Sequence, residues 1–233
     1  MGASHAEELV LRAKELGYQA LAVTDTNSLA GVVRAHLAAK EHGLKLLIGA
    51  ELTPLDAPAL VVWATDRKSY GRLSRLLTVG RRRAEKGKCD LKLEDIAAHS
   101  EGLIAGVLPQ SPVSPQPLSA YRDIFADRAY LLAELFRGPD DAQRLSELIA
   151  LSKKTKLPLV AAGDVHYHSP ARQPLHEVLT AVRLGKTVAA IGEERFPNAE
   201  RHLRSIEEMG TAFAGGPGGA AKGGRESLAR EDS

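Results

Sequence analysis

Cysteine, long apolar runs and an excess of one charge sign are nearly absent from this sequence of 233 residues. The single cysteine, Cys89, excludes internal disulfides and is typical of a protein in a reducing compartment. No cationic leader precedes an apolar stretch, and no apolar run approaches the ~20 residues that cross a bilayer. We therefore expect a cytoplasmic protein that makes no contact with a membrane.

The charges nearly balance, with 31 Lys and Arg against 29 Asp and Glu and a formal net charge of +2. This balance provides no bulk electrostatic reason to bind nucleic acid, so any contact with DNA must come from a wider context. The most basic segment, Arg81 to Lys88, could touch a phosphate backbone or an acidic partner. A solvated helix end, whose cations suit the helix dipole, is the simpler interpretation.

What the sequence does contain is an alternation of apolar runs and helical patterns, with 44% apolar and 26% charged residues. This composition indicates one globular domain. Six runs predict buried strands: 20–23, 44–48, 60–64, 103–107, 129–135 and 158–162. Four further patterns predict helices after the first strand: 29–42, 70–84, 140–154 and 170–184. Apolar strands separated by helices favour an α/β fold with a largely parallel sheet, either a barrel or a doubly wound layer.

The two ends of the sequence depart from this alternation. Ser4 to Glu7 predicts a capping box, so the sequence opens on a helix that ends at Gly17, and the strand that would feed this helix is missing. From Gly210 onward the sequence is rich in glycine and cannot bury a core. We expect a domain over residues 1–209 and a disordered tail over 210–233, with a proline-rich loop at 109–117. The abrupt change near Gly210 is what a frameshift or truncation would leave.

Polar side chains follow several predicted strands at their carboxyl ends. Asp164 and His166 stand two residues apart after 158–162, so their side chains project to one side of an extended chain. Asp25 and Glu51 follow two other strands. Such groups can share a metal ion or a phosphate at the edge where α/β folds place their chemistry. The alternatives are that the aspartates cap the next helix or brace a loop.

The remaining histidines carry no predicted role. His168 lies with His166 in a polar loop, where hydrogen bonding at the surface is the common use of a histidine. Five others fall on predicted helices and are expected to be solvated: His36, His42, His99, His176 and His202.

Several linked segments resemble the amino-terminal polymerase-and-histidinol-phosphatase (PHP) domain of bacterial C-family DNA polymerases. They are Gly2–Val10, Ala20–Val33, Ile48–Thr53, Tyr70–Thr78 and Asp164–Arg172. Within that family, Arg81–Gly87 and Phe196–Leu203 are most similar to the error-prone, damage-inducible polymerases. The resemblance covers residues 2–209, and linked segments are more specific than any single motif.

The resemblance implies a distorted (β/α)7 barrel with a polynuclear metal centre at the carboxyl ends of its strands. Asp25, Glu51, Asp164 and His166 match metal-ligand positions of the family. Carboxylates bridge divalent cations and imidazole binds zinc or manganese, so zinc, manganese or magnesium is the implied cofactor.

Departures from the family pattern weaken the predicted centre. The family's His-x-His pair should precede Gly2 and is missing. Thr26 stands where active members have a histidine, and the apolar run Leu60 to Ala64 does not contain the histidine expected near the third strand. Four positions out of a family set of about nine are too few for a three-metal cluster, because each ion needs several protein ligands. We expect no phosphodiesterase activity from this chain alone.

Three functions stay open. The first is the PHP domain of an error-prone DNA polymerase, a nucleotidyltransferase of translesion synthesis, DNA replication and DNA repair, with DNA and damage-response proteins as partners. The domain then braces the polymerase, since no polymerase active site occurs in this sequence. The second is a free-standing PHP-type metal-dependent phosphoesterase. The third is a non-catalytic interaction module for damage-response partners, although no clamp-binding motif is evident.

Overall fold

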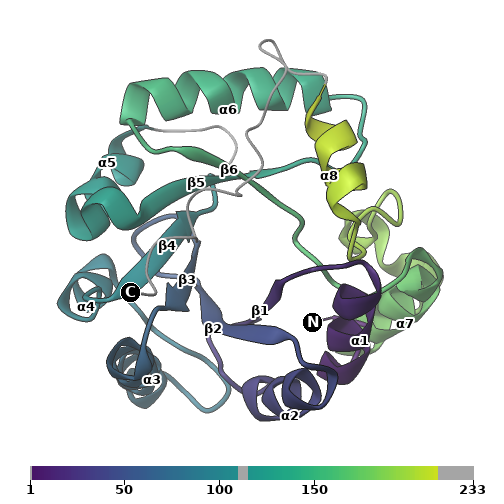
Figure 1. Cartoon of the computed structure of the whole chain (residues 1–233), viewed down its shortest axis with the longest axis horizontal. Helices are drawn as coiled ribbons and strands as arrows, with labels where there is room; N and C mark the ends of the chain where they lie inside the picture. The colour runs from purple at the N-terminus through teal and green to yellow at the C-terminus, as the bar shows by residue number, and fades with distance from the viewer. Residues whose placement is uncertain (1, 110–114, 215–233) are drawn as a thin grey trace.

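Six strands lie side by side in sequence order in the computed structural model, which describes residues 2–109 and 115–214. They are β1 (Ala20–Thr26), β2 (Lys45–Leu52), β3 (Leu60–Ala64), β4 (Leu103–Val107), β5 (Ala129–Glu134) and β6 (Leu159–Ala162). The sheet curls into a half-barrel with β1 and β6 at its two edges (Figure 1). The expected α/β architecture and the six strand positions are confirmed, and β3 and β4 match their predicted bounds.

The sheet is less parallel than we expected. Three pairings are parallel, β1–β2, β4–β5 and β5–β6, whereas β3 runs antiparallel to both β2 and β4. Only residues 53–59 join β2 to β3. A parallel crossover needs about a dozen residues or more, so this short connection forces the chain to reverse.

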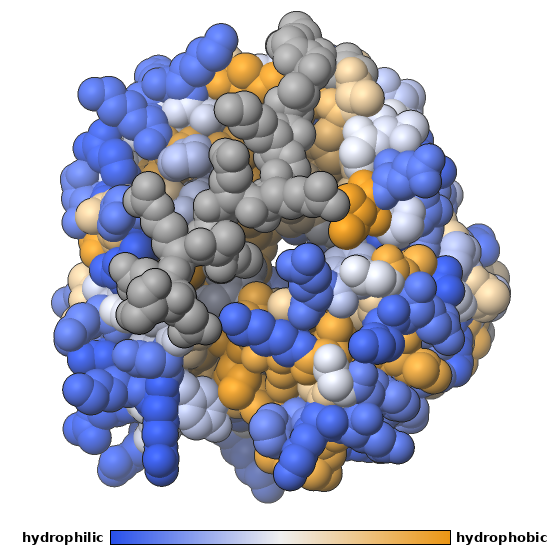
Figure 2. All heavy atoms as spheres, in the orientation of Figure 1, coloured by the Kyte–Doolittle hydropathy of each residue, from blue (hydrophilic) through white to orange (hydrophobic). Residues whose placement is uncertain are grey.

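Helices surround the outer side of the curled sheet (Figure 1). They are α1 (Ala6–Glu15), α2 (Val32–His42), α3 (Arg67–Arg83), α4 (Leu93–Ala98), α5 (Pro115–Phe125), α6 (Asp141–Thr155), α7 (Gln173–Leu184) and α8 (Ile206–Phe213). Figure 2 shows hydrophilic residues along most of the rim and hydrophobic ones nearer the middle. None of the described helices is long and apolar enough to cross a membrane.

The main core joins the sheet to α3, α4, α5 and α6. Leu73, Leu76 and Leu77 of α3 point inward as the helical spacing predicts, with exposures of 0%, 0% and 5%. A second, smaller cluster packs α1 and α2 against β1. The strands are not all buried on both faces, however, because Val160 in the edge strand β6 is 41% exposed.

Several local predictions need correction. The cap of α1 is His5 and not Ser4: the backbone N–H of His5 donates to Glu8 Oε2 at 2.9 Å. Helix α4 was not predicted, and α5 begins at Pro115 inside the expected proline-rich loop, of which 110–114 lie outside the described residues. His176 and His202 are 6% and 8% exposed and therefore buried, not solvated.

The carboxyl-terminal boundary also differs from the sequence pattern. Helix α8 continues through Gly210 to Phe213, whose side chain is 6% exposed and belongs to the main core. Packed structure thus extends beyond residue 209. The expected disorder of the tail concerns residues 215–233, which lie outside the described residues.

Candidate functional site

Asp25 and Glu51 stand at the carboxyl ends of the adjacent parallel strands β1 and β2. In the register, Asp25 lies opposite Ala50 and Thr26 opposite Glu51. Asp25 Oδ2 accepts the backbone N–H of Gly31 at 2.7 Å, immediately before α2. Glu51 Oε2 accepts a hydrogen bond from the Thr26 hydroxyl at 3.3 Å. Asp25 therefore braces the loop that leads into α2, which is one of the alternatives that the sequence left open beside a metal ligand.

A tight set of hydrogen bonds holds these two strand ends together. Asn27 has a left-handed backbone with φ of 49° and donates its N–H to Glu51 O at 2.7 Å. Its side-chain Nδ2 donates to Thr53 Oγ1 at 2.6 Å, and its Oδ1 accepts the backbone N–H of Thr53 at 3.2 Å. Arg81 donates twice to Asn27 O, at 3.1 and 2.8 Å. Sequence patterns did not single out this role of Asn27 and Arg81.

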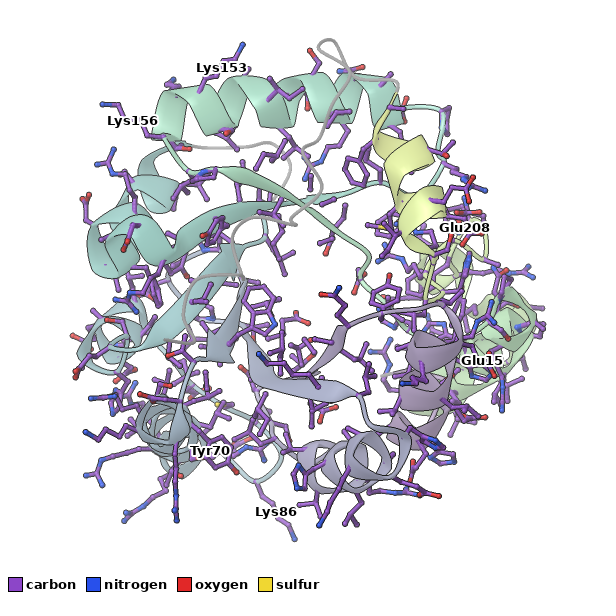
Figure 3. The ribbon with its side chains drawn as sticks, viewed as in Figure 1. Glu15, Tyr70, Lys86, Lys153, Lys156 and Glu208 are labelled. Carbon is purple, nitrogen blue, oxygen red and sulfur yellow. The ribbon has the colours of Figure 1, made fainter. Side chains whose placement is uncertain are left out.

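The rest of the basic segment behaves as a helix end. Arg82, Lys86 and Lys88 are exposed, and Lys86 projects away from the sheet (Figure 3). Arg83 differs because its guanidinium makes a two-pronged contact with Asp95, at 2.7 and 2.9 Å. The predicted solvated end is confirmed for the exposed cations, while Arg81 and Arg83 also fasten α3 to its neighbours.

Asp164 and His166 follow β6, and the structure brings their side chains together, although the backbone at Asp164 is not extended as the prediction assumed. His166 Nε2 lies 3.2 Å from Asp164 Oδ1, and the two side chains are 21% and 33% exposed. Asp164 has a φ of 40°, in the left-handed region that aspartate tolerates better than most residues. A basic residue far along the chain, Arg201, forms an ion pair with the other oxygen, Oδ2.

Arg201 is enclosed by aromatic rings. Its Cζ lies 3.9 Å from the ring centroid of Phe136 and 4.3 Å from that of Phe196. Burial lowers the pKa of Arg201, and the nearby Glu134 opposes this shift. Phe196 also stacks on His176 at 4.6 Å and meets His166 edge-on at 4.9 Å. The side chains around Asp164 thus form an aromatic and basic cluster.

A cavity of about 260 Å³ opens beside this cluster. Its lining combines two acids, two arginines, two histidines and three other residues: Asp164, His166, His176, Leu179, Thr180, Arg183, Glu194, Phe196 and Arg201. Arg183 pairs with Glu194 at 3.5 Å across this lining. The cavity is therefore polar, and its arginines already face carboxylates.

Glu134 is a site residue that the sequence analysis missed. It ends β5, where its register partner is Ala162 of β6. Desolvation by burial raises its pKa, Glu51 raises it further, and Arg201 and His166 lower it. Glu134 therefore shares an electrostatic environment with both candidate groups. An acidic residue directly after the apolar run Ala129–Ala133 was the available signal, the same one that identified Glu51.

The side chains do not fit the polynuclear metal centre that the resemblance implies. Within residues 2–109 and 115–214, no group of three or more His, Cys, Asp or Glu side chains is arranged to hold a metal ion. A zinc site takes three or four protein ligands, whereas the predicted positions divide between the β1–β2 ends and the segment after β6. Arg201, a cation, directly contacts the Asp164 carboxylate.

Comparisons with known proteins agree with the sequence resemblance. A family model described as the PHP domain matches residues 1–152. Error-prone DNA polymerases of Rhodopirellula baltica, Dechloromonas aromatica and Pseudomonas aeruginosa are 46%, 50% and 46% identical over 95%, 88% and 89% of this chain. Each match covers 20% of the relative, so the chain spans about a fifth of the length of these curated relatives.

A solved structure supports the fold. A protein of Bifidobacterium adolescentis, assigned as a metal-dependent phosphoesterase, superposes with a TM-score of 0.52, covering 71% of this chain and 83% of that one. The two sequences are 16% identical, so this likeness concerns the fold alone.

Proposed function

The chain belongs to the PHP domain family, and from this membership we propose that it serves as the accessory PHP domain of an error-prone DNA polymerase and does not itself hydrolyse phosphodiesters. The PHP-domain model matches residues 1–152, and relatives with that name match most of the chain at 43–50% identity. In such a polymerase other parts of the polypeptide carry out nucleotidyl transfer and translesion synthesis during DNA repair. Contact with DNA and damage-response partners, and a place in the cytoplasm, belong to the same proposal.

The observation that carries the accessory role is the ion pair between Arg201 and Asp164. A metal ion at this position would have to share the carboxylate with a guanidinium that stays charged at any ordinary pH. The other two candidate carboxylates also have protein donors, Gly31 for Asp25 and Thr26 for Glu51. These contacts support a domain whose strand ends are stabilised by protein groups.

A metal-dependent phosphoesterase is the second candidate. It is favoured by the Asp164–His166 pair beside a polar cavity. A zinc, manganese or magnesium ion bound there would activate water for attack on a phosphodiester. The donor set argues against this function, because two protein ligands hold a catalytic ion poorly.

The deciding experiment measures hydrolysis of bis(p-nitrophenyl) phosphate by the purified chain with added Zn²⁺, Mn²⁺ or Mg²⁺, together with its metal content. We expect no metal-stimulated hydrolysis and less than one equivalent of bound metal. The matched variants are Asp164→Ala and His166→Ala. Hydrolysis that depends on the metal and disappears in both variants would replace the accessory role with the phosphoesterase.

A further inference from the structure

Arg201 is held against the Asp164 segment by both its backbone and its side chain. Its carbonyl accepts the backbone N–H of His166 at 2.8 Å and that of Tyr167 at 3.4 Å. Its guanidinium pairs with Asp164 and packs against Phe136 and Phe196, so the side chain is only 21% exposed. An arginine fixed by so many contacts has a defined position and not the loose one of a surface cation.

The charges around Arg201 explain why a cation is needed there. Asp164 pairs with Arg201 directly, and the half-buried Glu134, which ends β5 opposite Ala162 of β6, interacts with Arg201 electrostatically. Glu51 adds a third carboxylate to the surroundings of Glu134. Burying carboxylates without a compensating positive charge is strongly unfavourable. Among metal-dependent enzymes, the bound ion supplies that charge.

We infer that Arg201 is the resident cation of the strand-end site, where its guanidinium neutralises Asp164 and offsets the partial burial of Glu134 in place of a metal ion. The inference rests on the proposed accessory function and deepens it, because a domain that carries its own cation folds without added metal. The rings of Phe136 and Phe196 pack against the planar guanidinium and hold it in place. The ammonium group of a lysine, which is not planar, would pack against these rings less well.

The first test compares the thermal unfolding of Arg201→Met with that of Arg183→Met. Both variants remove one arginine from the same cavity, but Arg183 and its partner Glu194 are 52% and 55% exposed, so their pair should contribute little. We expect Arg201→Met to lower Tm by roughly 5–10 °C, as for breaking a partly buried pair, and Arg183→Met to lower it by about 1 °C or less. Equal losses would overturn the inference.

Two further variants keep the test informative if Arg201→Met folds poorly. Arg201→Lys retains the charge at similar length, and we expect it to keep more of the wild-type Tm than Arg201→Met. Asp164→Asn, made in both backgrounds, isolates the pairing: it should lower Tm in the wild type and much less in Arg201→Met. The inference would fail if the Tm losses of Asp164→Asn and Arg201→Met simply added in the double variant. It would also fail if Arg201→Lys had a Tm as low as that of Arg201→Met, because the charge would then not be what stabilises the site.

A last arm measures Tm of the wild type with a chelator and with added Zn²⁺ or Mn²⁺, where we expect no change. A chelator-sensitive Tm would overturn the resident-cation role even if no hydrolysis is found. The opposite outcome is also possible: the protein hydrolyses the substrate only with metal, while its Tm does not change with metal and falls when Arg201 is replaced. That result would overturn the accessory function and leave the role of Arg201 intact.

Discussion

Single side chains determine how the strands end and how the helices join them. Asn27 follows β1 directly and Asp164 follows β6 after Gly163, and both adopt left-handed backbone conformations, with φ of 49° and 40°. Each such residue turns the chain sharply out of the sheet, and its short polar side chain remains at the strand end. Arg83 and Asp95 fasten α3 to α4 in the same local manner.

The Arg83–Asp95 pair allows a prediction about pH. The Arg83 guanidinium holds the pKa of Asp95 below its ordinary value of 3.8. Because the folded pKa is depressed, the stabilisation is present above that ordinary value and is lost as the pH falls through the folded pKa. Asp95→Asn should therefore lower the urea midpoint at neutral pH, and its deficit should shrink in acid. The exposed Asp123→Asn provides the control, and a deficit independent of pH would contradict the prediction.

At the scale of elements, close packing of β2 against β3 leaves no room for a side chain at one position. A Cβ added to Gly49 would lie 2.4 Å from Val62 O and 2.9 Å from Trp63 Cδ1. Gly49 pairs with Trp63 in the antiparallel register that reverses the sheet. The glycine is thus needed for the backbones to approach, and not for an unusual φ.

A pair of alanine substitutions tests this packing. Gly49→Ala should lower the free energy of unfolding by about 1–3 kcal/mol, because the backbone of β3 must shift to admit the methyl group. Gly71→Ala, inside α3 with nothing within 4 Å of the added Cβ, should raise it by roughly 0.5–1 kcal/mol. Urea denaturation measures both. Two changes of the same sign would rule out the steric explanation.

At the scale of the whole molecule, segments distant in sequence meet across the open side of the half-barrel. The backbone N–H of Ala3 donates to His166 O at 2.7 Å, and the Ser4 hydroxyl lies 2.7 Å from His168 Nδ1. The Tyr18 hydroxyl donates to Arg204 O at 2.7 Å. These contacts connect the first helix and its loop to the segments on either side of α7.

Removing one hydroxyl tests the contribution of this connection. Tyr18→Phe should lower the free energy of unfolding by about 1 kcal/mol, because the buried Arg204 carbonyl loses its donor. Tyr130→Phe is the matched control, since Tyr130 lies in β5, away from this connection, and is half-buried like Tyr18. The measurement is the urea midpoint of each variant. An equal decrease of the urea midpoint in both variants would mean that the hydrogen bond from Tyr18 to Arg204 O does not stabilise the connection.

How far the sequence predicted this protein depends on the range of the interaction. Apolar runs located the six strands, and helical spacing placed Leu73, Leu76 and Leu77 in the core, because these patterns follow from local backbone geometry. The spacing of Asp164 and His166 predicted that both side chains project to one side of an extended chain; the two side chains do meet, but the backbone at Asp164 is left-handed. The reversal of β3 was missed although the short connection of residues 53–59 was visible.

The sequence by itself determined the family, the alternation of strands and helices and the acidic residues at the strand ends. Only the tertiary structure decided what those acids contact: Arg201 reaches Asp164, and Glu134 enters the same electrostatic environment. The physical reason is that hydrogen-bond patterns and hydrophobic periodicity act over a few neighbouring residues. The balance of buried charge depends on distances between groups far apart in the chain, and packing alone sets these distances.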